Sequence, residues 1–406
     1  MSIQFKIKGF PQVSETFVVN SIVYAKRKGY KINIYVDKYL GLENSSQSDL
    51  LKKYNIEKDV VRPFKFSQNK FKKALQVLGI LFNPKVILYL IPYYRLQRKK
   101  NLSPLATLYQ YRNFKDGIVH VHFNNALHPL VELSKIGYIN PKCIISFHGY
   151  DAYLDNKEIF QKKYSHFYKK HVVAVTILSK HLSKRVINLG VDKKLIHIIN
   201  LGIDVNFFKS KPKQLKSNKI KMLSVGRLVQ WKGHTYGLKA VKQLIDEGYD
   251  VSYTIIGAGV LDNELKEETN KLGLDDYIDF KGALSQIEVF NAMKFNDIFL
   301  LPSTFDDIVG RRETFGLVSV EAQAMGLPVV GFNSGGFPET LLEGKTGFTV
   351  EDRNIDQLAS KIKYLIDNPD LYASMSQEAI KHAQNFDHKH TTQQYLDLYK
   401  KISLTN

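Results

Sequence analysis

The stretch DIFLLPSTFDDIVGRRETFGLVSVEAQAMGLPVVGF, residues 297–332, decides the fold class. It begins with an apolar run, Asp297–Leu301, and ends with a second one, Pro328–Phe332. Between them, Phe315–Met325 has the length and pattern of a helix. A strand, a helix and a second strand in this order form a βαβ unit, in which the two strands are parallel. The stretch therefore predicts a parallel sheet that is covered by helices.

The same alternation of short apolar runs and longer helical patterns continues in both directions along the chain. Six strands are predicted in the first half: Ile3–Lys8, Lys31–Val36, Gly117–Phe123, Cys143–Phe147, Val172–Leu178 and Leu195–Leu201. Six more are predicted in the second half: Lys219–Val225, Val251–Gly257, Ile278–Lys281, Asp297–Leu301, Pro328–Phe332 and Gly347–Val350. The pattern predicts two doubly wound, parallel-sheet α/β domains.

Helical patterns separate these strands. They are Ser14–Lys28, Asn125–Gly137, Lys157–Lys170, Ser179–Leu189, His234–Glu247, Leu261–Leu272, Ser285–Lys294, Phe315–Met325 and Phe337–Glu343. The polar segment Asn206–Asn218 is the natural linker between the two sets. We therefore assign an N-terminal domain to residues 1–206 and a C-terminal domain to residues 207–385. Residues 386–406 form a C-terminal helix, which we expect to return to the N-terminal domain.

Composition excludes several classes of protein. Hydrophobic residues make up 44% of the 406 residues and charged residues 24%, as in an average globular protein. Cys143 is the one cysteine, which excludes a disulfide framework and a cysteine-based zinc finger, and indicates a reducing compartment. The first residues lack the long apolar run of a signal peptide. The longest apolar stretches, Ala74–Phe82 and Val86–Pro92, are far shorter than the roughly 18–20 residues of a membrane-spanning helix.

The positive charge lies entirely in the first half. Residues 1–206 hold 34 Lys and Arg against 13 Asp and Glu, whereas residues 207–406 hold 24 against 26. Residues 62–115 contain 12 Lys and Arg and no acid, interleaved with aromatic and aliphatic side chains, and residues 161–191 contain seven more with no acid. Both stretches predict contact with an anionic membrane surface. A solvated basic face is the alternative. Nucleic acid is not expected, because no helix-turn-helix, RNP or zinc-finger pattern is present.

Two strand-to-loop junctions in the second half suit phosphate. Gly226 allows a sharp exit from its strand, and Arg227 and Lys232 follow just before the helix at His234. An anion bound there would meet two cations and the unpaired N–H groups of a helix N-terminus. A surface loop with two unremarkable cations is the alternative. Gly257-Ala258-Gly259 follows the next strand, although a lone Gly-x-Gly often marks only a tight turn.

A third junction carries two carboxylates. Glu313 lies just before a helix and Glu321 lies within it, so eight residues of helix, about 12 Å, separate them. This distance excludes an adjacent acid–base pair and favours holding opposite ends of an extended ligand that offers vicinal hydroxyls. Backbone N–H groups of Thr314–Gly316 suit phosphate or sugar oxygens. The alternatives are helix-dipole stabilisation by Glu313 and a solvated position for Glu321.

Together these motifs resemble the donor domain of a retaining glycosyltransferase of family 4, which has the GT-B architecture. The matching motifs are Gly226-Arg227-Leu228, Trp231-Lys232-Gly233, Gly257-Ala258-Gly259, Pro302-Ser303, Glu313 with Glu321, and Gly335-Gly336-Phe337-Pro338-Glu339. In the first half, Phe10–Phe17 is similar to the opening of the exopolysaccharide branch of this family. Phe147-His148-Gly149-Tyr150-Asp151 resembles its acceptor-domain histidine loop.

The resemblance implies a role for each matching residue. Arg227 and Lys232 would bind the donor diphosphate, Glu313 the transferred sugar, and Glu321 the ribose. The backbone of Phe315-Gly316-Leu317 would contact sugar or phosphate, with Gly226, Gly257, Gly259 and Thr314 beside it. On the acceptor side the resemblance implies His148, which would reach the sugar and acceptor, together with Gly9, Phe10, Ser14 and Asp151. A structural, fully bonded role is the alternative for His148.

The expected reaction follows from the same resemblance. The donor is a nucleotide diphosphate sugar, and the acceptor is a lipid-linked or membrane-associated glycan in polysaccharide biosynthesis. Retention of configuration implies front-face attack. No Asp-x-Asp occurs, so neither a metal nor another cofactor is expected. The protein would lie in the cytoplasm at the inner face of the membrane. A transferase for a soluble acceptor and a non-catalytic polyanion-binding protein remain as alternatives.

Overall fold

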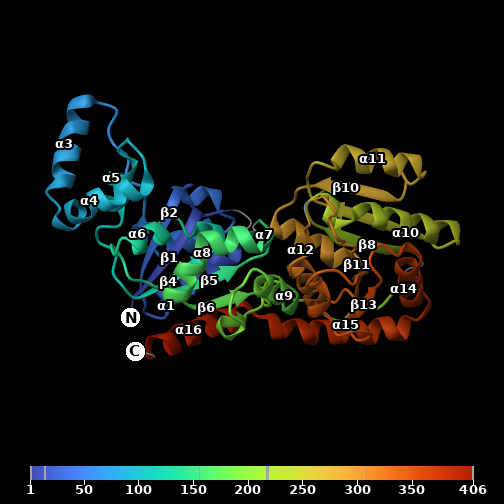
Figure 1. The fold of residues 1–406 in the computed structure, drawn as a ribbon. Coiled ribbons are helices and arrows are strands. Elements are labelled where there is room, and N and C mark those ends of the chain that lie inside the picture. The colour runs from blue at the N-terminus through green and yellow to red at the C-terminus, as the bar shows by residue number, and fades with distance from the viewer. Residues whose placement is uncertain (1, 13–14, 155, 216–218, 309, 405–406) are drawn as a thin grey trace. The chain divides into compact units, whose positions relative to one another are not determined.

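A computed structural model describes residues 2–12, 15–154, 156–215, 219–308 and 310–404 (Figure 1). The chain divides into two compact units. Unit 1 comprises Met1–Ile177, Ser183–Ile199 and Thr392–Asn406, and unit 2 comprises Leu178–Leu182 and Asn200–Thr391. The sequence-based boundary at residue 206 falls within unit 2, where Phe208 is buried in the core. Each unit contains one parallel sheet covered by helices, so the predicted fold class is confirmed.

The sheet of unit 1 has seven parallel strands in the order β3-β2-β1-β4-β5-β6-β7. The strands are β1 Ser2–Phe10, β2 Lys31–Tyr39, β3 Val60–Val61, β4 Ile118–His122, β5 Lys142–Phe147, β6 Val172–Ile177 and β7 Ile196–Ile198. The helices are α1 Thr16–Arg27, α2 Ser48–Lys53, α3 Lys70–Leu81, α4 Pro84–Gln97, α5 Ser103–Gln110, α6 Leu130–Lys135, α7 Tyr150–Tyr153 and α8 Lys157–His171. A ninth helix, α9 Lys180–Asn188, has its first three residues in unit 2 and the rest in unit 1.

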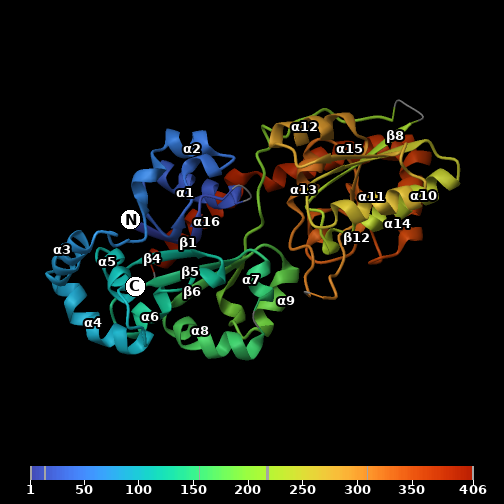
Figure 2. The ribbon, with the colours of Figure 1, turned by 90° about the horizontal axis from the view of Figure 1, so that it is seen from above.

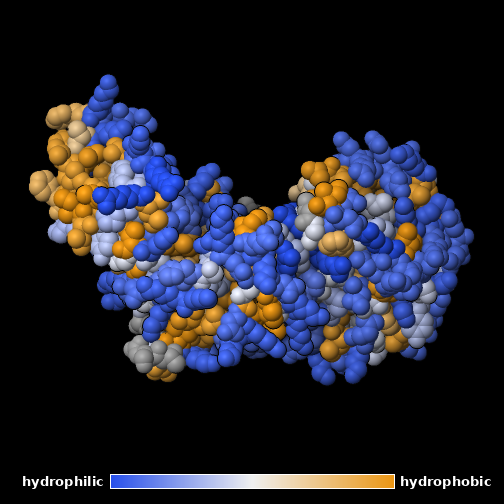
Figure 3. Space-filling view, viewed as in Figure 1, coloured by the Kyte–Doolittle hydropathy of each residue, from blue (hydrophilic) through white to orange (hydrophobic). Residues whose placement is uncertain are grey.

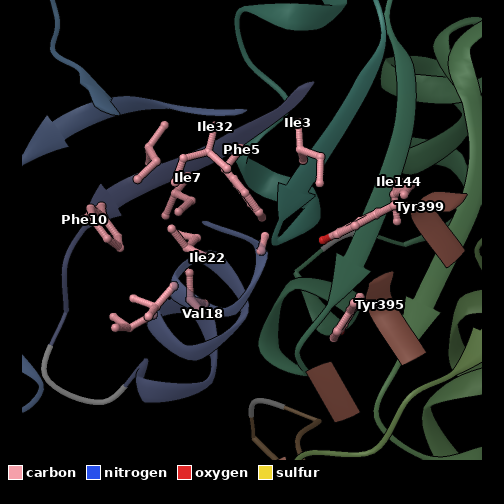
Figure 4. Close-up of a cluster of buried hydrophobic side chains, with 14 of the residues drawn as sticks. Ile3, Phe5, Ile7, Phe10, Val18, Ile22, Ile32, Ile144, Tyr395 and Tyr399 are labelled. Carbon is pink, nitrogen blue, oxygen red and sulfur yellow. The ribbon is translucent and has the colours of Figure 1, made fainter. Parts of the chain in front are cut away.

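The core of unit 1 forms around its central strand β1 (Figure 4). Ile3, Phe5 and Ile7 alternate along β1, so the two-residue period of a strand places all three on one face. Val18 and Ile22 of α1 belong to the same buried cluster. So do Tyr395 and Tyr399 of the last helix, α16 His388–Leu404. Residues from the two ends of the chain therefore share one core.

The sheet of unit 2 has six parallel strands in the order β10-β9-β8-β11-β12-β13. They are β8 Ile220–Val225, β9 Val251–Ile256, β10 Ile278–Gly282, β11 Ile298–Leu301, β12 Val329–Phe332 and β13 Gly347–Val350. The helices are α10 His234–Asp246, α11 Asp262–Lys271, α12 Gln286–Phe295, α13 Leu317–Ala324, α14 Ile355–Asp367 and α15 Pro369–Ala383. Alternate residues of β11 enter two different core clusters, Leu300 one and Phe299 the other. The sheet is therefore covered on both faces, as a doubly wound fold requires.

Two predicted helices differ from the structure and one short strand was not predicted, each for a local reason. The helix predicted over 337–343 is wrong, because only a 3-10 turn, Phe337–Thr340, forms and Leu341 is extended. The helix predicted over 125–137 is reduced to α6, which begins directly after Pro129, a residue that lacks a backbone N–H and favours the start of a helix. Strand β3 was not predicted, since two residues carry no periodicity.

Helices α3 and α4 project from unit 1 away from its sheet in both ribbon views (Figures 1 and 2). Among the described residues, no single helix is long and apolar enough to cross a membrane. The pair formed by α3 and α4 meets that criterion only when the two are taken together, and a bend of 102° separates them.

Candidate functional site

Several loops of unit 2 lie at one edge of its sheet, where the parallel strands have their carboxyl ends. Open α/β sheets bind ligands at this edge. The loop after β8 and the loop after β9 are joined by their backbones: the Leu228 N–H donates to the Ala258 carbonyl at 3.0 Å. A Cβ on Gly257 would lie 1.8 Å from the Gly226 carbonyl oxygen, and one on Gly259 would lie 2.2 Å from that of Leu228. The predicted Gly-x-Gly turn is thus required for packing one loop on the other.

An ion pair between Lys232 and Glu313 lies at this edge. The ammonium of Lys232 contacts Oε2 of Glu313, and the two side chains are only 14% and 12% exposed. The hydroxyl of Ser303 donates to the same carboxylate oxygen at 3.4 Å. The stem of Lys232 covers Gly226, whose added Cβ would meet it at 3.5 Å. The structure therefore brings together three predicted site residues from the loops that follow β8 and β11.

The Glu313 carboxylate is held as an anion despite its burial. Burial alone would raise its pKa, but the charge and hydrogen bond of Lys232 and the backbone N–H groups of Thr314 and Phe315 hold that pKa below the ordinary value. These N–H groups were predicted to face phosphate or sugar, whereas in the structure they face the Glu313 side chain. The backbone of Glu313 is fixed as well, because its carbonyl accepts the Gly336 N–H at 2.8 Å.

The remaining predicted donor residues lie in the turn before α13 and at its start. Phe315 is buried in the core of unit 2, so only its backbone is left for a ligand. Gly316 has a φ of +85° and precedes Leu317, the first residue of α13. Thr314 accepts a hydrogen bond through its carbonyl from Ser179 Oγ at 2.8 Å. The Glu339 carboxylate accepts the N–H groups of Lys180 and His181, at 2.7 and 2.8 Å, which places it at the start of α9.

Arg227 is exposed and has an aromatic neighbour, Trp231, to which the sequence motif assigned no role of its own. Its guanidinium lies 5.3 Å from the ring centroid of Trp231, and that of Arg311 lies 5.6 Å from the same ring. Among the residues that the structure describes, Arg227 forms no ion pair. It is therefore a cation available to an incoming anion, unlike Lys232.

Glu321 lies in α13 without a hydrogen-bond partner for its carboxylate among the described residues. Burial raises its pKa to about 8. The solvated position considered for Glu321 therefore does not match its surroundings. No hydrogen bond or ion pair joins Glu321 to Lys232 or Glu313 in the described part of the chain, so the structure does not place it in the ion-paired cluster.

Replacing Glu321 with Gln is expected to stabilise the ligand-free protein at high pH and not at low pH. The folded pKa of about 8 exceeds the ordinary value of 4.5. Ionisation therefore favours the unfolded chain progressively as pH rises from about 4.5 to 8. Gln does not ionise. The free energy of unfolding of the Gln variant should therefore exceed that of the wild type by near zero at pH 4.5 and by about 2–4 kcal/mol at pH 8. Urea unfolding at both pH values measures the gain, and exposed Glu267→Gln is the control. An equal gain at both pH values contradicts the prediction.

In unit 1, His148 follows β5 and lies beside a second histidine, His122 of β4. Nε2 of His148 and Nδ1 of His122 are 3.0 Å apart, and Nε2 of His122 lies 3.4 Å from Ser21 Oγ. Burial lowers the pKa of His122 to about 3, and burial and the nearby His122 lower the pKa of His148 well below its ordinary value. Both rings are therefore neutral at pH 7.

The hydrogen bonds assign the protons on these rings. The Ser21 hydroxyl donates to the Val18 carbonyl at 2.9 Å, so Ser21 Oγ can only accept from His122 Nε2–H. Neutral His122 then has a bare Nδ1, which accepts from His148 Nε2–H. This leaves His148 Nδ1 as an acceptor, and it is buried with no partner in the described part of the chain. His148 is not the fully bonded structural histidine that the sequence left open.

His120 is that structural histidine instead. Its Nδ1 lies 2.6 Å from the Tyr399 hydroxyl and its Nε2 lies 2.6 Å from Ser146 Oγ. His120 and His122 alternate along β4, and this two-residue spacing could have identified His122 as a neighbour of the strand-end loops.

The other acceptor-side residues shape the loops. The Asp151 carboxylate accepts backbone N–H groups from Asn124, at 2.8 Å, and from His148 and Gly149, both at 3.0 Å. Burial raises the pKa of Asp151 to about 6, against the effect of these bonds. Asp151 thus holds the backbone of the histidine loop.

Gly9 and Phe10 end β1. Gly9 accepts the Gln12 side-chain amide through its carbonyl at 3.3 Å. The ring of Phe10 is buried in the core, which leaves only its backbone for an acceptor. Ser14 lies outside the described residues. Among the described residues, no group of three or more His, Cys, Asp or Glu is arranged to hold a metal ion.

Residues 206–382 match the family described as glycosyl transferases group 1. The chain is 28% identical over 371 residues to the amylovoran biosynthesis glycosyltransferase AmsK of Erwinia amylovora, covering 89% of each chain. It is 25% identical over 371 residues to the putative colanic acid biosynthesis glycosyltransferase WcaL of Escherichia coli, covering 89% of this chain and 90% of that protein.

Solved structures share the fold over the full chain. A glycosyltransferase from Rickettsia africae superposes with a TM-score of 0.72 and 23% identity, covering 100% of this chain and 99% of that one. The HepE protein of Anabaena, in complex with UDP, superposes with a TM-score of 0.71 and 19% identity, covering 99% and 100%. Two parallel-sheet domains of this kind make up the GT-B architecture. Residues 206–382 therefore match the glycosyl transferases group 1 family, within a chain that has the GT-B fold.

Proposed function

We propose that this protein is a retaining glycosyltransferase of polysaccharide biosynthesis. It transfers a sugar from a nucleotide diphosphate sugar to a lipid-linked or otherwise membrane-associated glycan acceptor. The observation that carries the proposal is the buried Lys232–Glu313 pair at the carboxyl edge of the sheet of unit 2. One partner suits a diphosphate and the other suits sugar hydroxyls, so the pair fits a ligand that contains both.

Positive charge at the strand ends suits the leaving group. Departure of a nucleoside diphosphate develops negative charge, and cations that are already in place stabilise it without reorganisation. Arg227 is available to the diphosphate, and Lys232 is held in position by Glu313. The proposal includes no metal and no further cofactor. Glu321, which carries a proton at neutral pH when no ligand is bound, is assigned to the ribose.

On the acceptor side, His148 supplies a hydrogen-bond acceptor. Its Nδ1 has no partner among the described residues, and His122 fixes its tautomer. A hydroxyl of the sugar or of the acceptor would donate to this atom. Front-face attack, with retention, follows from the family resemblance.

The relatives support the choice of pathway and donor. AmsK and WcaL are named for the biosynthesis of amylovoran and colanic acid. HepE of Anabaena has been solved with UDP-glucose, although at 20% identity that similarity concerns the fold. These names favour a uridine nucleotide and a polysaccharide product as the first substances to test.

A donor screen tests the proposal. The purified chain is incubated with a panel of nucleotide diphosphate sugars, and nucleotide release is followed together with calorimetric binding of each nucleoside diphosphate. We expect saturable binding of one nucleotide and slow hydrolysis of its sugar. Arg227→Ala should weaken binding roughly tenfold to hundredfold, since it removes a charged hydrogen-bond donor. Lys239→Ala, on the exposed face of α10, is the control. Absence of binding for every nucleotide would refute the proposal.

A further inference from the structure

We propose that α3 and α4 form a docking surface that inserts into the interface of an anionic lipid bilayer. The evidence for this surface is the exposure and the charge of its residues, and it does not depend on the reaction proposed above.

One face of α3 is apolar and unpartnered. Phe71, Leu75, Leu78 and Phe82 are all exposed, Phe71 at 73% and Phe82 at 86%. Their spacings of four, three and four residues place them on a single helical face. The buried residue of α3, Ile80, lies off this face. The helix therefore turns its apolar stripe outward, the reverse of a helix that packs on a core.

Helix α4 continues the surface. Ile87, Leu88 and Ile91 are exposed, at 54%, 69% and 63%, whereas Val86 and Tyr93 are buried. We call these three residues, together with Phe71, Leu75, Leu78 and Phe82, the apolar patch. In Figure 3 hydrophobic residues gather over the part of unit 1 that α3 and α4 form. An exposed apolar area of this extent marks a binding site in a soluble protein.

The charge around the patch selects the partner. Residues 70–100, all of which the structure describes, contain eight Lys and Arg and no Asp or Glu. None of these residues is in an ion pair. Lys70, Lys72 and Lys73 open α3, and Arg98, Lys99 and Lys100 follow α4. A cationic rim around an apolar face matches a bilayer with anionic headgroups, in which both kinds of residue find their preferred surroundings.

Length and bend indicate an interfacial position. The 12 residues of α3 and the 14 of α4 extend about 18 and 21 Å, less than the roughly 30 Å of a hydrocarbon core. The bend of 102° prevents the two from forming one continuous span. Tyr94 of α4 suits the headgroup level, where amphipathic rings concentrate.

The second basic stretch, residues 161–191, lacks this combination. Lys162, Lys163, Lys169 and Lys170 belong to α8, whose exposed large apolar residue is Ile159. Charge without an apolar face predicts at most a weak electrostatic contribution. The structure therefore separates the two stretches that the sequence had treated alike.

Flotation of the full chain with lipid vesicles tests the proposal. Vesicles of phosphatidylcholine are compared with vesicles containing roughly one-third phosphatidylglycerol, at roughly 150 mM NaCl. We expect the protein to float with the anionic vesicles. The variant Phe71→Ser/Leu75→Ser/Phe82→Ser should lower the partition coefficient roughly a hundredfold, and Lys70→Gln/Lys72→Gln/Lys73→Gln at least about tenfold.

Two control variants make the result specific. Val260→Ser/Ile287→Ser/Phe295→Ser removes three equally exposed apolar residues from unit 2 and should change partitioning less than about twofold. Lys162→Gln/Lys163→Gln/Lys169→Gln/Lys170→Gln removes charge from α8 and should weaken binding less than the three-lysine variant of α3. As a second measurement, Phe82→Trp should show a blue-shifted emission and quenching by brominated lipid only with anionic vesicles.

Several results would overturn the proposal. Equal binding of the wild-type protein to neutral and anionic vesicles is one, and full binding by the apolar-patch variant is another. Dimerisation that disappears in that variant, without vesicle binding, would assign the surface to a second copy. Nucleotide release from a donor sugar in water does not need the bilayer, so the apolar-patch variant should retain it. Failure of the docking surface and failure of the proposed reaction are thus distinguishable.

Discussion

Replacing either Lys232 or Glu313 is expected to slow sugar transfer strongly, and replacing both is expected to restore stability without restoring transfer. Lys232→Met leaves a buried carboxylate without its cation, and Glu313→Gln leaves the ammonium without its anion. Breaking a buried pair from one side costs about 3–5 kcal/mol, whereas removing both charges is often nearly neutral. The ordinary electrostatic contribution of such a group to the transition state predicts a loss of roughly 100- to 1,000-fold in kcat for each single variant.

The double variant Lys232→Met/Glu313→Gln separates structure from catalysis. Urea unfolding should show it more stable than either single variant, and a nucleotide-release assay should show it at least as inactive. Calorimetry should also distinguish the two single variants, because Lys232→Met should weaken nucleotide binding more than Glu313→Gln does. Transfer at the wild-type rate by the double variant would show that the pair serves folding alone.

Gly335→Ala is expected to lower the free energy of unfolding by about 3–5 kcal/mol. Its φ is +67°, and an added Cβ would lie 1.9 Å from the Glu313 carbonyl oxygen. Backbone strain alone costs about 1–2 kcal/mol for Ala in this region. The clash must also move the segment that carries Glu313, so transfer should be lost together with stability.

Gly273→Ala is the matched control. Gly273 has nearly the same φ, +66°, but nothing lies within 4 Å of its added Cβ. The loss of stability in Gly273→Ala should be limited to the backbone strain, about 1–2 kcal/mol. Urea unfolding of both variants measures the difference, and the wild-type transfer rate should persist in Gly273→Ala. Equal losses would mean that the contact with Glu313 does not constrain the loop.

The sheets could be predicted from sequence because each buried strand is a short apolar run between helical patterns. The helix expected over 337–343 failed because Pro338 and the Thr340 hydroxyl, which bonds back to the Phe337 carbonyl at 2.7 Å, favour a tight turn. Propensity does not distinguish such a turn from the first turn of a helix.

The candidate site was predictable in its residues and not in its contacts. Motif order identified Lys232 and Glu313, but 81 residues separate them and no spacing rule pairs them. The tautomer of His148 is set by His122, which comes from a different strand. The charge of residues 62–115 was visible in the sequence. The outward apolar face of α3 was not, since periodicity alone does not show which side of a helix meets the protein.

Tyr395 and Tyr399 have a consequence for the order of synthesis. They lie near the end of the chain and are buried in the core that β1 begins. During translation that core cannot form completely until α16 has left the ribosome. By then every residue of unit 2 has already been made. Unit 1 is thus begun before unit 2 and completed after it, and a nascent chain released before Tyr395 is made would expose the apolar surface that these tyrosines cover.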